Sequence, residues 1–153
     1  MPRVETFTPE MLMRYFDGRN IRYQQRDTDR FDLLISGLVT YFNGPLQVII
    51  SRDSSKQHLV MHATLGIALP PQRTDEAIGI CNEWNTAHIY PVACVARVRQ
   101  DDRVLMAKSA IVISAGIHAE LLDRFIRTSV TATREFLHWA HDSHNFHREP
   151  AAT

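Results

Sequence analysis

Four histidines near the C-terminal end of the chain have the spacing that most directly suggests chemistry. His138, His141, His144 and His147 recur at every third residue, with Asp142 among them. Neutral imidazoles bind zinc, nickel or copper, and several of them close together can chelate one ion. His138, His141 and His144 are therefore the candidate metal ligands, and a metal-binding protein or metal-dependent enzyme is one hypothesis for the function.

Helix geometry supports a second interpretation of the same histidines. Three-residue steps displace each side chain by about 60° around an α-helix, so four of them leave a single face. A 3₁₀ segment would align them, but such segments are short. Histidines at a helix C-terminus also interact favourably with the negative end of the helix dipole. We therefore favour a histidine-rich helix end with no cofactor.

The common catalytic signatures are absent from the sequence. It contains neither of the glycine-rich phosphate loops, nor a G-x-S-x-G elbow, nor an H-E-x-x-H pair. Cys81 and Cys94 fit no zinc spacing, and we expect two packed thiols rather than a disulfide. No catalytic residue is predicted, and we expect that the protein is not an enzyme.

The most distinctive tetrapeptide is Asn82-Glu83-Trp84-Asn85. As a ligand site it would offer amide donors and acceptors, but no reacting group lies near it in the sequence. We expect a structural role, in which Trp84 fills core space while Asn82 and Asn85 satisfy backbone groups near a helix end.

Composition limits the class of protein. The chain has 153 residues, of which 44% are hydrophobic and 22% are charged, and its 17 basic residues balance 17 acidic ones. This length predicts one domain over residues 1–153, with a core over about 8–142 and a loose tail over 143–153. A neutral domain lacks the field that attracts nucleic acid or anionic lipid. No apolar run is long enough to cross a membrane, and we expect a cytoplasmic protein.

The first half of the sequence predicts a helix and then a β meander. Thr8 is a suitable N-cap, Pro9 suits the first helical position and Gly18 can end the helix. Alternating apolar residues then predict three antiparallel strands, with an additional short strand near Ile21 as the alternative. Asn43-Gly44 is the strongest hairpin signal in the chain.

The second half predicts a helix from Thr74 to before Pro91, a hairpin that turns at Asp101-Asp102, and a long final helix. One apolar stripe runs along that final helix with the small residues Ser129 and Ala132 at its middle. Small residues permit a sheet or a partner to approach closely. The candidate partner-binding residues are therefore Ser129, Ala132, Phe136 and Trp139.

These elements follow the order α-β-β-β-α-β-β-α. Helices and strands do not alternate strictly, which predicts an α+β domain with an antiparallel sheet and helices packed on one face.

The sequence resembles the YbjN family in three segments and in the order of its elements. The segments are Cys81–Asn85, the following Ile89-Tyr90-Pro91-Val92-Ala93, and Leu69-Pro70 before them. This is a family of small bacterial proteins described as sensory transduction regulators, and the resemblance covers roughly residues 8–142. It implies a fold similar to type III secretion chaperones and a non-enzymatic role in regulation or in holding a protein client, often as a homodimer. It carries no catalytic residues to this chain, and the histidine run is not part of its pattern.

The leading hypothesis is thus a non-catalytic protein-binding module, regulatory or chaperone-like and homodimeric. The metal hypothesis is the alternative from a different class. A small-molecule sensor with a pocket between sheet and helices is a third, which no sequence feature favours.

Overall fold

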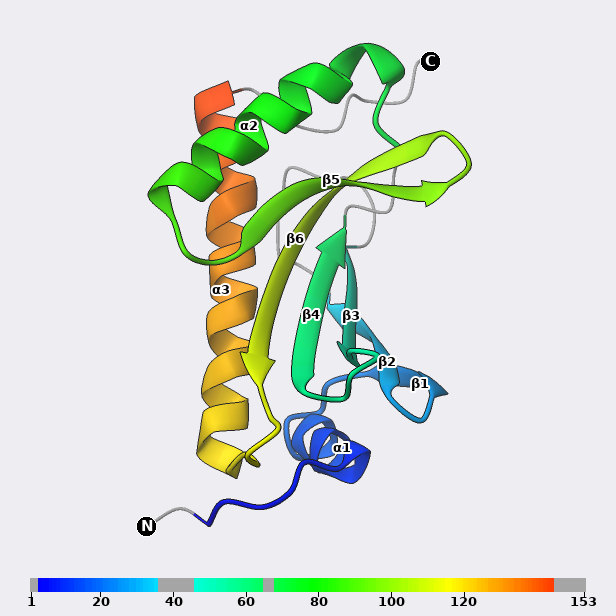
Figure 1. Ribbon diagram of the computed structural model, residues 1–153, viewed down its shortest axis with the longest axis vertical. Coiled ribbons are helices and arrows are strands. Elements are labelled where there is room, and N and C mark those ends of the chain that lie inside the picture. Colours follow the sequence, from blue (N-terminus) through cyan, green and yellow to red (C-terminus); the bar gives the residue numbers. More distant parts are fainter. Residues whose placement is uncertain (1–2, 36–45, 65–67, 145–153) are drawn as a thin grey trace.

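The protein forms one six-stranded antiparallel sheet with three α-helices (Figure 1). The structure, a computed structural model, describes residues 3–35, 46–64 and 68–144. The strands lie in the order β1-β2-β3-β4-β6-β5, so β1 and β5 are the two edges. The elements are α1 (Pro9–Gly18), β1 (Tyr23–Asp27), β2 (Arg30–Ile35), β3 (Leu46–Arg52), β4 (His58–Thr64), α2 (Thr74–Ala87, after a 3₁₀ turn over Pro71–Arg73), β5 (Val92–Arg99), β6 (Asp102–Val112) and α3 (Ala119–His144).

This architecture confirms the predicted α+β class with an antiparallel sheet. Four strands precede α2, because the alternative short strand forms as β1 at the edge of the sheet. Four of its five residues are exposed, and it lacks apolar alternation, which explains its weak signal. The predicted Asn43-Gly44 turn lies outside the described residues. The predicted loose tail over 143–153 starts too early, since Ser143 and His144 belong to α3.

The two faces of the sheet differ in burial. Strand pairing aligns Leu33, Val48, Ala63, Ala107 and Ala93 in one row across five strands, and all five are nearly fully buried. This face joins the buried residues of all three helices in one hydrophobic cluster. The core therefore lies between this face and the helices, as expected from helices packed on one side.

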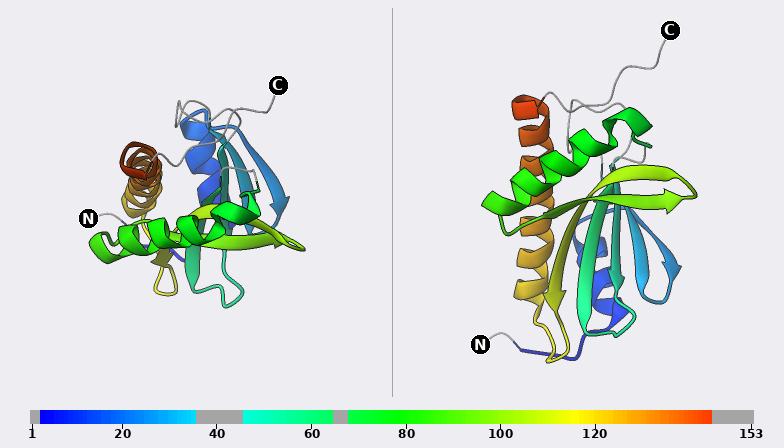
Figure 2. Two further views of the ribbon diagram at one scale, coloured as in Figure 1. Left: turned by 90° about the horizontal axis from the view of Figure 1, so that it is seen from above. Right: turned by 45° about the horizontal axis from the view of Figure 1, so that its top comes forward.

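The 26-residue helix α3 extends along most of the molecule (Figures 1 and 2). Its first half lies near α1, and its second half lies near α2. The views of Figure 2 also show α2 running beside the edge strand β5. Consequently α3 fixes the relative positions of the other two helices.

Two glycines provide a matched test of this backbone. Gly79 lies in exposed mid-helix, and a Cβ there would meet no atom within 4 Å. We expect Gly79→Ala to raise the free energy of unfolding by about 0.5–1 kcal/mol, because alanine restricts the unfolded chain. Gly116 has φ +93°, and its Cβ would lie 2.8 Å from the Glu5 carbonyl oxygen.

Gly116→Ala should therefore lower stability by about 1–3 kcal/mol. Urea denaturation of both variants measures the two effects. Equal stabilities for the two variants would contradict the described backbone at Gly116.

Candidate functional site

The turn between α2 and β5 is held by side chains of the distinctive tetrapeptide. Trp84 donates from Nε1 to the carbonyl of Pro91 at 2.9 Å. Asn85 makes two bonds to one residue: its Nδ2 donates to the Ala93 carbonyl, and its Oδ1 accepts from the Ala93 N–H, both at 2.9 Å. This pair of bonds fixes α2 to the edge strand β5.

Trp84 also joins α2 to α3. Its ring centroid lies 5.2 Å from that of Phe136 and 5.3 Å from that of Trp139. The His88 ring stacks on its indole at 3.6 Å. Asn82 is exposed, and its backbone carbonyl accepts the Thr86 hydroxyl. The tetrapeptide thus contributes packing and backbone hydrogen bonds at one junction.

The C-terminal histidines of α3 have separate surroundings. His141 Nδ1 lies 3.0 Å from an oxygen of Asp142, and His144 Nε2 lies 3.0 Å from Glu83 of α2. His138 is half-buried, and His147 lies outside the described residues. Over residues 3–35, 46–64 and 68–144, no three His, Cys, Asp or Glu side chains are arranged to hold a metal ion.

The two cysteines are free thiols. Burial raises the pKa of Cys81 to about 11, with a smaller contribution from Cys94. Burial also raises the pKa of Cys94. Because the thiolate is the nucleophile, neither side chain is activated for covalent chemistry at neutral pH.

A carboxylate with three side-chain partners lies between α1 and α3. Asp123 accepts a hydrogen bond from the Tyr15 hydroxyl at 3.0 Å and pairs with Arg19 at 2.8 Å and Arg127 at 2.7 Å. Burial raises its pKa, but the Tyr15 bond and the two guanidinium charges outweigh burial and lower it. These contacts tie α1 to α3 and account for the perturbed pKa without a catalytic role.

The predicted partner-binding stripe of α3 faces inward. Ser129, Ala132 and Phe136 are all less than 9% exposed, and Trp139 is half-buried against the core. An apolar stripe on a helix can pack against the protein's own core or against a partner. The burial of these residues shows that their spacing here reflects packing inside one chain. The stripe as a whole is therefore not an accessible partner surface, although Ala132, at 8% exposed, also lines a surface groove on α3.

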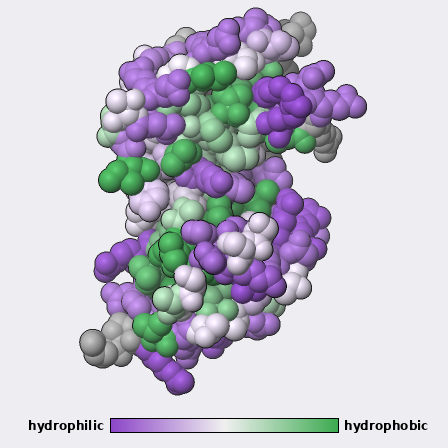
Figure 3. All heavy atoms as spheres, viewed as in Figure 1, coloured by the Kyte–Doolittle hydropathy of each residue, from purple (hydrophilic) through white to green (hydrophobic). Residues whose placement is uncertain are grey.

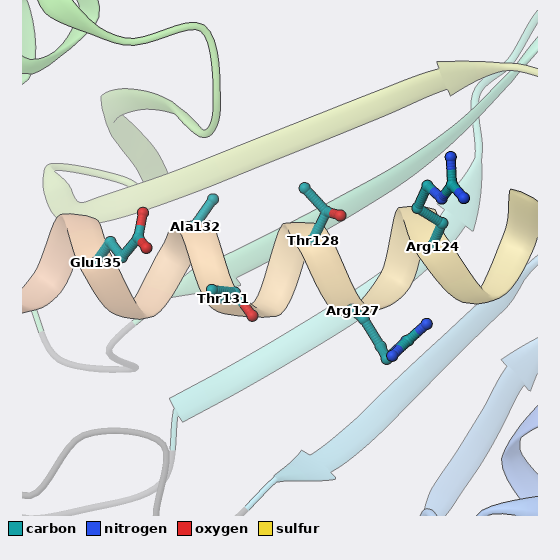
Figure 4. Close-up of a pocket in the computed structure, with 6 residues that line it drawn as sticks. All are labelled: Arg124, Arg127, Thr128, Thr131, Ala132 and Glu135. Carbon is teal, nitrogen blue, oxygen red and sulfur yellow. The ribbon is translucent and has the colours of Figure 1, made fainter.

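A shallow groove of about 510 Å³ lies on α3 itself. Figure 4 shows its residues along the helix, with the sheet strands behind. Oppositely charged residues stand on either side of Thr131, with Arg127 four residues before it and Glu135 four residues after it. The remaining lining residues are Arg124, Thr128 and Ala132. Sequence reasoning missed this groove, although the i, i+4, i+8 spacing of Arg127, Thr131 and Glu135 could have indicated it.

A cleft between β6 and α3 bears on the small-molecule hypothesis. It has a volume of about 170 Å³, and Tyr90 and Phe125 are among its mainly apolar lining residues. Ligand pockets usually occupy about 300–1,000 Å³. A larger hollow of about 650 Å³ beside α1 is lined by charges of both signs, including Arg14 and Glu120. Neither cavity favours a sensor of small apolar molecules.

Comparisons with known proteins identify a family and a fold. The family model "YbjN: Putative bacterial sensory transduction regulator" matches residues 8–142. A solved structure, "Crystal structure of YbjN, a putative transcription regulator from E. coli", is similar with a TM-score of 0.74 at 12% sequence identity. The similarity covers 94% of this chain and 97% of that chain. No curated protein matches. Among the described helices, none is long and apolar enough to cross a membrane.

The double hydrogen bond of Asn85 generates a stability prediction. Asn85→Ala leaves the N–H and carbonyl of Ala93 without this partner, and we expect a loss of about 1–3 kcal/mol in unfolding free energy. Asn82→Ala is the matched control, because both side chains are exposed but that of Asn82 makes no hydrogen bond within the described residues, and its effect should stay within about 0.5 kcal/mol. Chemical denaturation with the Trp fluorescence signal measures both. Equal losses would show that the Asn85 bonds contribute nothing specific.

Proposed function

The chain belongs to the YbjN family, and we propose on that basis that it is a non-catalytic bacterial regulator that acts by binding a protein partner. The family match over residues 8–142 is the observation that carries the proposal. We further propose a chaperone-like mode of action, a homodimeric state and a cytoplasmic location.

The chemistry of the described side chains supports a binding role. The thiols have raised pKa values, and three carboxylates with lowered pKa values are held by separate local contacts. Asp32 pairs with Arg26 and Arg30, Asp53 with His58, and Asp123 with Arg19 and Arg127. These carboxylates stabilise the fold where they stand. Catalysis would instead require such groups to converge on one reacting atom.

The groove on α3 is the surface that we propose for self-association. If two α3 helices pack antiparallel about a two-fold axis at Thr131, Arg127 faces Glu135 of the partner subunit, and the reverse contact forms equally. Arg127 is 71% exposed, although it also pairs with Asp123. Thr131 is small enough to let the helices approach. The arrangement of charges is therefore self-complementary.

A partner-capture experiment tests the binding role. The untagged chain, purified without added metal, is immobilised and exposed to lysate of its source bacterium. We expect one protein to be retained at a constant ratio and to be displaced by excess free chain. Retention of none, together with a stoichiometric metal increment in native mass spectrometry, would instead support the metal alternative.

Charge exchange tests the homodimer. Glu135→Arg should weaken self-association by about tenfold, because it places two cations opposite each other. The double variant Arg127→Glu with Glu135→Arg should restore association, since the complementary contact is re-formed with the charges exchanged. Sedimentation velocity over a concentration series measures both effects.

Asp101→Arg, in the exposed β5–β6 turn, makes the same change in net charge away from α3. It should leave association unchanged. A monomer at every concentration of the native chain would contradict the homodimer. Because Arg127→Glu also removes the ion pair with Asp123, the double variant is first shown to be folded by circular dichroism, and a folded double variant that does not associate would contradict the proposed α3 contact.

A further inference from the structure

The sheet face opposite the core carries a second set of aligned residues. Strand pairing places Asp32, Ile49, His62, Lys108 and Val92 in one row across β2, β3, β4, β6 and β5. Of these, Lys108 and Val92 are exposed, whereas Ile49 and His62 are half-buried. Figures 1 and 3 look onto the β4–β6 part of this face, and Figure 2 shows α1 behind it. We refer to it as the open face.

The open face carries more positive than negative charge. Asp32 accepts hydrogen bonds from Arg26 at 2.7 Å and from Arg30 at 3.2 Å, so one carboxylate is shared by two guanidinium groups. Lys108 is exposed, and none of the ion pairs found in the described part of the chain engages it. The cationic groups on this face therefore outnumber its carboxylates and can bind additional carboxylates from a ligand.

His62 lies between these cations. Burial, followed by the positive charges of Lys108 on β6 and Arg30 on β2, lowers its pKa. Asp32 is the carboxylate of the same row, two strands away. Beyond the effect of burial, the two cations lower the pKa of His62 even though this carboxylate is present, as their positions beside it on the open face require.

Apolar side chains lie among the charges. The half-buried Ile49 neighbours His62 across the strands, and Val60 in the adjacent row is only 7% exposed. At the margins Val92 is 50% exposed and Val112 is 60% exposed. Figure 3 shows hydrophobic and hydrophilic residues side by side in the middle of the molecule. A ligand that covers this face must therefore offer aliphatic groups as well as anions.

We propose that the open face binds an acidic protein segment in which Glu or Asp alternates with aliphatic residues. Carboxylates of the segment would pair with Lys108 and with the Arg26–Arg30 pair, while its aliphatic side chains cover Ile49 and Val92. Charge complementarity selects this occupant. The inference rests on the proposed protein-binding function and specifies the chemistry of the partner.

A direct binding measurement tests the proposal. The probe is a fluorescein-labelled 12-residue peptide of Glu and Leu, with a Lys and Leu peptide of the same pattern as the control. Fluorescence anisotropy with the full chain should show binding of the acidic peptide only, and added salt should weaken it. Lys108→Glu should weaken binding by about tenfold, because it replaces an attraction with a repulsion.

The matched control is Arg134→Glu, an equivalent charge reversal on an exposed position of α3 outside the open face. It should leave peptide affinity within about twofold, since long-range surface charges are screened. A histidine NMR titration gives a second readout: the bound acidic peptide should raise the pKa of His62, whereas a peptide bound elsewhere leaves it unchanged.

Equal binding of both peptides, or equal losses in the two variants, would overturn the acidic-segment proposal. The partner-capture and charge-exchange experiments are independent of it. A captured partner that still binds Lys108→Glu with native affinity would leave the proposed function intact and would reject the open face as its site.

Discussion

The packing of Trp84 is the contact on which the rest of the arrangement depends. Its indole touches Phe136 and Trp139 of α3 while its N–H donates to the Pro91 carbonyl at the start of β5. One side chain thus fixes α2 relative to both the edge strand and the long helix. Tyr15, Arg19 and Asp123 tie the other half of α3 to α1. The sheet face between these two attachments is covered because α3 is held at both of them.

Much of this fold could be predicted from the sequence, because its strongest signals are local. Thr8, Pro9 and Gly18 delimit α1 within a residue of its observed end, and Thr74 begins α2 as expected. The strand β1 is harder to predict, since its polar residues form no buried apolar face. Only its pairing with β2 makes it a strand. Periodicity detects burial, and an exposed edge strand shows little of it.

The surfaces were harder to predict than the fold. The apolar stripe of α3 predicts close approach by a sheet or a partner, and Ser129 and Phe136 are buried inside the protein itself. A sequence does not show which neighbour covers an apolar residue. The groove at Thr131 and the open face with Lys108 depend on side chains that are brought together by helix geometry and by strand register. His62, Lys108 and Arg30 lie on three strands, and register is set by the whole sheet.

The double hydrogen bond from Asn85 to Ala93 also affects how the molecule avoids aggregation. An edge strand offers unpaired N–H and carbonyl groups onto which another chain can add a strand. At Ala93 both groups are already occupied by a side chain that imitates a neighbouring strand. The opposite edge, β1, carries Gln24, Arg26 and Asp27, which disfavour growth of the sheet in that direction. Each edge of the sheet thus carries a feature that disfavours the addition of another strand: the side-chain bonds at Ala93 on one edge and the polar and charged residues of β1 on the other.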